Sequence, residues 1–329
     1  MKRLKLLFLF SLFQFFTLVD AVAAENPLLQ YRAGLDSIYT DNAIYVFNMA
    51  NNTLTTTGDF VFEPYLTFIM KRRAALFSQK LIVYVSSDIF SRYSPLNYQT
   101  YSALFEQGIG NKAFLNLKYT LIPNLVLREE DISNTGQGSI DTGLNYRLQV
   151  FTLSLDKDFS QNYNFYIYGK NTLKTYSTPF VFRSAMGQTL GVDLTLRMDK
   201  QTTAIMGLAY EVNQSRKGFR TLVGFPAFND DTDYTSPGIA FSVTHHVSPE
   251  DYFRLKVGFR KRHYTADLAD PLHGGRDDQA NNVAGTNYFK LTPGWTWKIG
   301  YEYFKWDSNK SYANYTVNSL TTGIDYLFK

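Results

Sequence analysis

The sequence predicts an all-β chain that folds as a single antiparallel up-and-down transmembrane β-barrel of about fourteen strands. From Tyr31 to the end of the chain, β-branched and aromatic residues recur at every second position, which is the period of a strand with one apolar face. The strand-like segments are separated alternately by a long polar connection and by a very short one. This alternation is typical of membrane barrels, which have long loops at one end and short turns at the other.

The expected strands are 30–39, 58–70, 75–87, 98–109, 113–128, 140–156, 162–176, 184–197, 202–214, 234–246, 251–265, 284–292, 295–307 and 314–328. Short turns are expected at 71–74, 110–112, 157–161, 198–201, 247–250 and 293–294, with longer loops between the other strands. An even number of strands puts both ends of the barrel sequence at the short-turn end. A soluble β-sandwich is the alternative, but its connections would not alternate strictly between long and short.

The segment 202–214 illustrates the two faces of such a strand. Met206, Leu208 and Tyr210 alternate with Gly207 and Ala209, so one face suits lipid and the other suits a water-filled lumen. Aromatic side chains gather near strand ends, where they are expected to form girdles at the level of the lipid headgroups. These residues are Tyr31, Tyr39, Tyr84, Tyr163, Tyr252, Tyr264 and Trp295.

The first 24 residues have the features of a secretory signal peptide. A basic start, Met1 to Lys5, precedes an apolar run from Leu6 to Val19, and Ala21 and Ala23 supply a small-residue cleavage site. The apolar run is shorter than the ~20 residues that a membrane-spanning helix needs. The sequence therefore predicts a signal peptide at 1–24 followed by one barrel domain at 25–329.

Composition removes several classes of function. The chain has no cysteine, so disulfide frameworks, cysteine zinc sites, cysteine nucleophiles and attached c-type haem are excluded. The formal net charge is only +4, and half of it comes from the first 24 residues. No polybasic surface is indicated, so nucleic acid is not an expected partner. No cofactor and no resident metal are expected.

The C-terminal strand carries an alternating pattern that ends in an aromatic residue. Its apolar positions are Leu320, Ile324, Tyr326 and Phe328, with Thr322 between them. This pattern resembles the terminal strand signal of Gram-negative outer-membrane β-barrel proteins, although Lys329 follows the aromatic residue. The resemblance implies location in the outer membrane, contact with its lipid and lipopolysaccharide, delivery by periplasmic chaperones and insertion by the barrel assembly machinery. It names no substrate.

Charged side chains dominate the face that the alternation assigns to the lumen. On strand 251–265, Arg254, Lys256, Arg260 and Arg262 form a row of cations, here called the basic ladder. The other expected pore-lining residues are Lys118, Arg147, Arg197, Glu211, Lys298 and Glu302. Further lumen charges are expected at Arg32, Asp36, Glu63, Lys80, Glu106, Lys170, Asp193 and Asp325. Basic residues outnumber acidic ones, which favours anions in a pore unless the charges pair across the lumen.

The sequence leaves three functions open. The first is a channel for passive diffusion of small hydrophilic solutes with a slight anion preference, since fourteen strands enclose more space than the eight whose interior is filled by side chains. The second is an enzyme acting on outer-membrane lipid or surface polymer, which would need a site near His263 or His273. The third is a structural or accessory barrel of an envelope export or redox complex.

Two acidic loops could offer oxygen ligands to calcium, although neither has EF-hand spacing. One contains Asn229, Asp230, Asp231 and Asp233, and the other contains Asp270, His273, Asp277 and Asp278. Solvated loop charge is the more common explanation for such clusters. His246 and Ser248 have the His-x-Ser spacing of outer-membrane lipid A deacylases, but the topology assigns them to the short-turn end, away from the outer leaflet.

Overall fold

The structure is a computed structural model of the chain. It describes residues 28–48, 53–74, 77–110, 112–126, 145–178, 180–220 and 227–328. The expected signal peptide at 1–24 and the whole of the expected loop at 129–139 lie outside these residues. Within them, no helix has both the length and the apolar character needed to cross a membrane.

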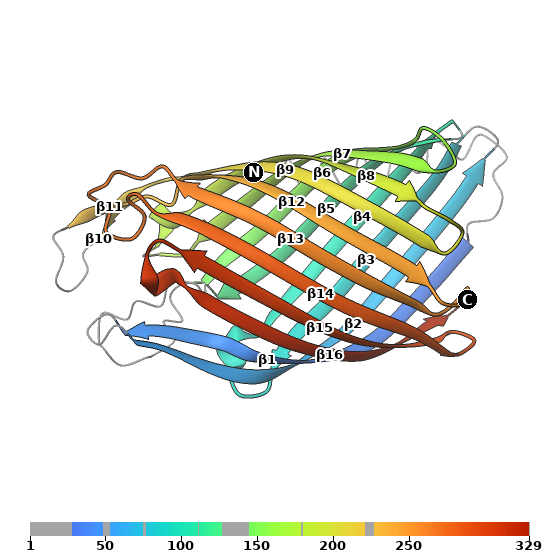
Figure 1. Ribbon diagram of the computed structural model, residues 1–329, viewed down its shortest axis with the longest axis horizontal. Helices are drawn as coiled ribbons and strands as arrows, with labels where there is room; N and C mark the ends of the chain where they lie inside the picture. Colours follow the sequence, from blue (N-terminus) through green and yellow to red (C-terminus); the bar gives the residue numbers. More distant parts are fainter. Residues whose placement is uncertain are drawn as a thin grey trace.

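Fourteen strands form a closed antiparallel barrel, which confirms the predicted fold (Figure 1). Following the ring, the strand order is β1, β16, β15, β14, β13, β12, β9, β8, β7, β6, β5, β4, β3 and β2. Their bounds are β1 Leu28–Asn48, β2 Thr53–Ala74, β3 Phe77–Phe90, β4 Tyr98–Ile109, β5 Ala113–Val126, β6 Asn145–Asp158, β7 Tyr163–Tyr176, β8 Ala185–Arg197, β9 Thr202–Ser215, β12 Tyr234–His246, β13 Tyr252–Tyr264, β14 Asp277–Thr292, β15 Trp295–Ser308 and β16 Tyr315–Phe328.

The ring closes where the first and last strands meet. Strand β1 pairs with β16 from Tyr31 opposite Phe328 to Thr40 opposite Ser319. The beginning of β1 and the end of β16 therefore lie together at the short-turn end, as predicted. Closure gives each of the fourteen barrel strands a hydrogen-bonded neighbour on both sides, which a sheet in lipid requires.

Three parts of the long connections differ from the sequence prediction. The expected loop 40–57 is largely strand, because β1 and β2 continue as a paired hairpin beyond an irregularity between Thr40 and Ile44. Strand β14 begins at Asp277, seven positions earlier than expected, where its polar residues pair with β13 and β15. The expected loop 215–233 holds a two-stranded sheet of β10 (Gly218–Arg220) and β11 (Phe228–Asp230).

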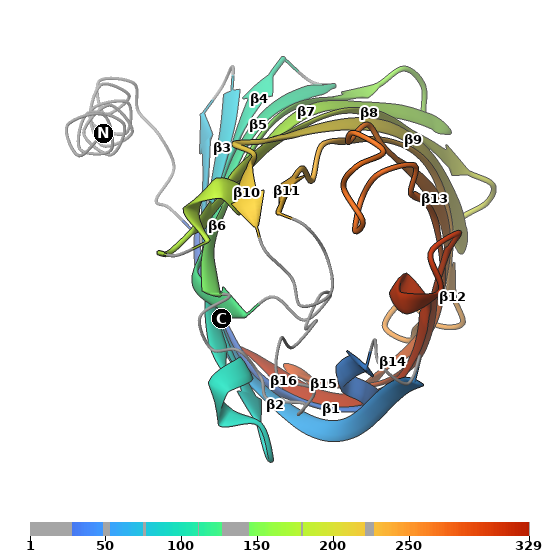
Figure 2. The ribbon, with the colours of Figure 1, turned by 90° about the vertical axis from the view of Figure 1, so that its left-hand side faces the viewer.

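Loops at one end of the barrel fold back over its mouth. Viewed from this end, β10, β11 and the β13–β14 connection lie within the outline of the ring (Figure 2). A small apolar cluster of Ala43, Val61, Phe90, Leu96 and Val126 packs near this end of β1, β2, β3 and β5. We call this the loop end of the barrel.

The apolar face of the strands points outward. Exposed apolar side chains such as Leu35, Leu208 and Val257 lie on the outer face, whereas their strand neighbours Asp36, Gly207 and Lys256 point inward. The outer girdle contains Tyr31, Tyr39, Tyr163 and Trp295. Tyr84, Tyr252 and Tyr264 do not belong to it, because the register turns them into the lumen; Tyr84, for example, donates a hydrogen bond to Glu63.

Replacing Leu208 with arginine tests the outward face. Leu208 is 48% exposed near the middle of β9, so a charge there would enter hydrocarbon. We expect Leu208→Arg to destabilise the barrel, lowering its free energy of unfolding in lipid vesicles by about 2–4 kcal/mol. The matched control is Ile205→Arg on the same strand, whose side chain points inward between Thr195 and Ser242. Equal losses in the two variants, measured by urea titration, would contradict the assignment of faces.

Candidate functional site

The lumen carries most of the charged residues that the sequence assigned to it. Continuous pairing on both sides of the strands places the following expected residues on the inward face: Lys118 on β5, Arg197 on β8, Glu211 on β9, Arg254, Lys256, Arg260 and Arg262 on β13, and Lys298 and Glu302 on β15. The C-terminal signal residues Leu320, Ile324, Tyr326 and Phe328 lie on the outer face of β16.

Arg147 is an exception, and its predicted lumen position is wrong. Unbroken pairing of β6 with β7 puts Arg147 on the same face as Phe151 and Leu153, which is the outer face. The sequence misleads here because the apolar phase changes within β6, from Tyr146 and Leu148 to the odd positions that follow. Tyr146 points inward and stacks on Tyr176, with ring centroids 4.9 Å apart.

Five of the lumen cations form ion pairs with acidic residues. The pairs are Arg32 with Asp325 at 3.5 Å, Lys80 with Glu106 at 3.9 Å, Lys170 with Glu211 at 3.9 Å, Arg197 with Asp158 at 3.1 Å and Lys298 with Asp36 at 2.5 Å. Their charges therefore largely cancel within the wall of the barrel.

The Lys298–Asp36 pair spans the strand that lies between its partners. Lys298 is on β15 and Asp36 is on β1, and Gly323 on β16 is the register partner of both. A Cβ atom at Gly323 would lie 2.8 Å from Cε of Lys298 and would collide with the Asp36 carboxylate. Glycine is thus required here so that the two side chains can meet.

Three members of the basic ladder, Arg254, Lys256 and Arg260, are not neutralised in this way. Arg254 donates to Oγ1 of Thr244 at 3.3 Å and lies over the rings of Tyr252 and Tyr288. Within the described residues, Lys256 and Arg260 make no ion pair with a carboxylate. Lys118 on β5 likewise has no ion-pair partner there. Apart from Lys118, the lumen cations without an ion pair among the described residues therefore lie on β13.

Aromatic rings hold the fourth cation of the ladder. The guanidinium carbon of Arg262 lies 4.2 Å from the ring centroid of Tyr234 and 4.6 Å from that of Trp306. Tyr234 in turn donates a hydrogen bond of 2.7 Å to Glu211. Contacts with these two rings hold the guanidinium in position. The contact of Arg262 with these rings was not predicted from the sequence, although Tyr234 and Trp306 both occupy inward positions of the alternation.

A buried polar cluster joins three of the connections at the loop end. Arg183, in the short helix η3 (Val181–Arg183), places Nε 2.9 Å and Nη2 2.8 Å from Oδ2 of Asp230 on β11. The Nδ1 atom of His273 lies 3.1 Å from Oδ2 of Asp270 and 3.4 Å from Oδ1 of Asp230. We call these four residues the loop lock. All four are buried, and buried charges are tolerated where they pair with each other.

The loop lock combines residues from both loops that the sequence offered as calcium ligands. Asp230, Asp270 and His273 bring one ligand atom each within 4.8 Å of one another. Their oxygens already accept hydrogen bonds from the Arg183 guanidinium and from backbone amides of Asp231 and Leu272. The arrangement therefore joins loops through ion pairs. The other acidic residues are elsewhere: Asp278 pairs with Arg276 at 2.9 Å, and Asp277 points outward.

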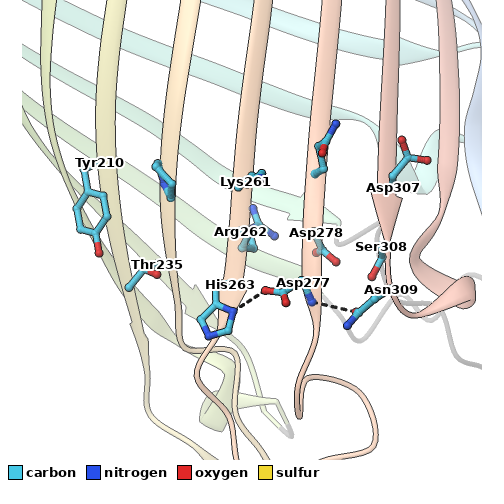
Figure 3. Close-up of a pocket in the computed structure, with 12 residues that line it drawn as sticks. Tyr210, Thr235, Lys261, Arg262, His263, Asp277, Asp278, Asp307, Ser308 and Asn309 are labelled. Carbon is cyan, nitrogen blue, oxygen red and sulfur yellow. Dashed lines mark hydrogen bonds and ion pairs between the residues drawn. The ribbon is translucent and has the colours of Figure 1, made fainter.

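Polar side chains also form a belt on the outer face near the loop end, shown in Figure 3. Here His263 and Asp277 share a hydrogen bond of 2.5 Å, beside a cavity of about 640 Å³ that Lys261 and Asp307 also line. At the short-turn end, Ser248 hydrogen-bonds to Asp251 at 3.0 Å within the turn, which agrees with a structural role for the His246 region.

The fold defines a class, that of closed antiparallel β-barrels of fourteen strands with an apolar outer face. No family model matches the chain, and no curated protein is similar to it in sequence. Among solved structures, the outer membrane channel DcaP of Acinetobacter baumannii is similar, with a TM-score of 0.51 and 10% identity over 94% of this chain and 98% of that one.

Two further barrels are less similar. The anion-selective porin from Comamonas acidovorans has a TM-score of 0.45 and 7% identity, over 93% of this chain and 100% of that one. OmpT, an outer membrane protein of Vibrio cholerae, has a TM-score of 0.47 and 8% identity, over 93% and 99%. At these identities the likeness concerns the fold alone.

The loop lock should weaken in acid. Burial acts to raise the pKa of Asp270, but hydrogen bonds and the charge of His273, together with backbone amides, outweigh it and lower the pKa below its ordinary value. The stabilisation from the carboxylate is therefore complete above the ordinary pKa of about 3.9 and is lost as pH falls through the lowered value. Hydrogen-exchange protection of residues 265–276 should thus be lower at pH 3 than at pH 7.

Asp270→Asn should reduce this protection already at pH 7. Asp267→Asn is the matched control, because Asp267 lies in the same loop, is exposed and accepts a backbone hydrogen bond only from Ala269 through its side chain. Equal protection of the wild-type loop at both pH values would show that the carboxylate does not hold it.

Proposed function

We propose that the protein is an outer-membrane channel for passive diffusion of small hydrophilic solutes, with a preference for anions. The basic ladder carries this proposal, since five other lumen cations are paired with carboxylates and Lys256 and Arg260 are not. Uncompensated cations on one wall raise the local concentration of anions over a Debye length, about 8 Å at physiological salt.

The proposal includes the route by which the barrel reaches its membrane. Residues 1–24 would direct export and be removed, and the outward pattern of Leu320, Ile324, Tyr326 and Phe328 would be recognised by periplasmic chaperones and the barrel assembly machinery. The apolar outer face would then contact lipid, with lipopolysaccharide at the loop end. The oligomeric state is left open by this proposal.

Reversal potentials in a salt gradient across planar bilayers test the anion preference. We expect the wild type to conduct and to favour anions. Replacing all four ladder residues with glutamine should shift the permeability ratio toward cations, most strongly at low salt. The double variant Lys256→Gln/Arg260→Gln should shift it in the same direction while leaving the ring contacts of Arg254 and Arg262 intact.

The matched control for this test is Arg147→Gln, which removes one cation from the outer face. It should leave the reversal potential unchanged. A wild-type channel that favours cations, or a four-fold variant with an unmoved reversal potential, would refute the anion preference. Failure of the folded protein to conduct at all would refute the channel.

The hydrogen-bonded His263–Asp277 pair favours an enzyme acting on outer-leaflet lipid as the second candidate. A carboxylate on one ring nitrogen can orient a histidine as a general base. However, no hydroxyl among the described residues hydrogen-bonds to the other nitrogen of His263. If this candidate is correct, His263→Ala should abolish release of fatty acid from mixed phospholipid and lipopolysaccharide vesicles, whereas His245→Ala at the short-turn end should not. No release by the wild type would eliminate it.

A further inference from the structure

One wall of the lumen is hollowed because its inward positions lack large side chains. Two neighbouring rows of register partners cross β9, β12 and β13, with Gly207, Ala240 and Gly258 in one row and Ala209 and Gly238 in the other. These five residues floor a cavity of about 460 Å³, here called the lumen hollow. Its volume falls within the range of small-molecule sites, about 300–1,000 Å³.

Opposite charges stand on the two sides of this floor. Asp193 on β8 is the register partner of Gly207, and Arg260 on β13 is the partner of Gly238. Both residues line the cavity. Within the described residues, neither side chain forms a hydrogen bond or an ion pair. The hydrogen-bonding groups of both side chains are therefore available to a ligand, although the charge of Arg260 also acts on the nearby Glu211 carboxylate.

The other charged residues around the lumen hollow are already engaged. Glu211 accepts a hydrogen bond from Tyr234 and lies 3.9 Å from the Lys170 ammonium. Arg262 lies between the rings of Tyr234 and Trp306. A ligand in the hollow would thus meet one carboxylate and one guanidinium that form no hydrogen bond or ion pair within the described residues, in addition to the aromatic edge at Trp306.

The separation of the two charges limits the length of such a ligand. Strands β8 and β13 are three places apart in the ring, which corresponds to about 14 Å between their backbones. Asp193 extends over Gly207 on β9, where its Oδ1 would lie 2.5 Å from an added Cβ, and Arg260 packs against Gly238 on β12, with its Cγ 3.9 Å from an added Cβ there. The gap between the two charged groups is therefore shorter than the backbone separation. One to three residues of extended peptide, at about 3.5 Å each, would bridge it.

We propose that the lumen hollow binds small zwitterionic solutes of about dipeptide length, with the carboxylate on Arg260 and the ammonium on Asp193. This inference rests on the proposed channel for its route of access, and it deepens that function by naming the class of solute that the wall selects. A simple anion would gain only the Arg260 contact and would approach Asp193 unfavourably. A zwitterion gains both contacts.

Binding of glycylglycine to the refolded barrel tests the proposal by calorimetry in detergent. N-acetylglycylglycine, which lacks the ammonium, and glycylglycine amide, which lacks the carboxylate, are the matched ligands. We expect the wild type to bind glycylglycine roughly tenfold more tightly than either, a difference of about 1.4 kcal/mol, because each analogue loses one charge-assisted hydrogen bond. Asp193→Asn should remove the preference over the acetylated ligand and Arg260→Gln the preference over the amide, while Arg147→Gln should keep both.

Asp193→Asn also separates this inference from the anion preference. Removing a lumen carboxylate should increase the anion-to-cation permeability ratio while lowering the affinity for glycylglycine. Equal binding of glycylglycine and its acetylated form by the wild type would overturn the zwitterion site and leave the anion channel standing. A wild type that binds glycylglycine selectively but passes no current would uphold the site and refute the channel. Absence of any binding would overturn the site.

Discussion

No water reaches the polypeptide backbone inside the hydrocarbon of a membrane, so every peptide N–H and C=O group there must be paired within the protein. In this chain the pairing is supplied by neighbouring strands, and the ring of fourteen closes between β1 and β16. Closure with alternating faces then assigns each strand residue to lipid or to the lumen. The cationic and anionic side chains are thereby gathered inside, where they must either pair with each other or meet water and solute.

The distribution of paired and unpaired charge follows from which side chains the register brings together. Around the closing strands, cations and carboxylates are matched, and the Lys298–Asp36 contact depends on the missing side chain of Gly323. On β13, the register partners of Lys256 and Arg260 are small or neutral residues: Ser242 and Ala284 for the first, Gly238 and Ala280 for the second. Neither Lys256 nor Arg260 has a carboxylate as a register partner, and the small partners also leave the space that forms the lumen hollow.

Most of the strands could be predicted from the sequence because lipid on one side and water on the other impose a two-residue period. The predicted strand bounds and faces were wrong where the side chains of a strand depart from that two-residue period. Residues 277–283 are too polar to suggest a membrane strand, yet inward Asp278 and Ala280 are held between β13 and β15. In β6, Leu148 and Val150 are apolar although they point inward, and this reversed the expected face of Arg147.

The loop lock could not be predicted, because its members are up to 90 positions apart in the sequence and meet only when the loops fold over the mouth.

The ion pairs at the closing strands bear on how the ring can open. Arg32 and Asp325 belong to the first and last strands, and Lys298 reaches from β15 past β16 to Asp36 on β1. In an unrolled sheet these partners would stand at opposite margins, so neither pair can form before the ring is complete. The two ion pairs therefore stabilise only the closed barrel. Any sideways exit of a solute into the bilayer through this seam would have to release both pairs as well as the backbone hydrogen bonds between β1 and β16.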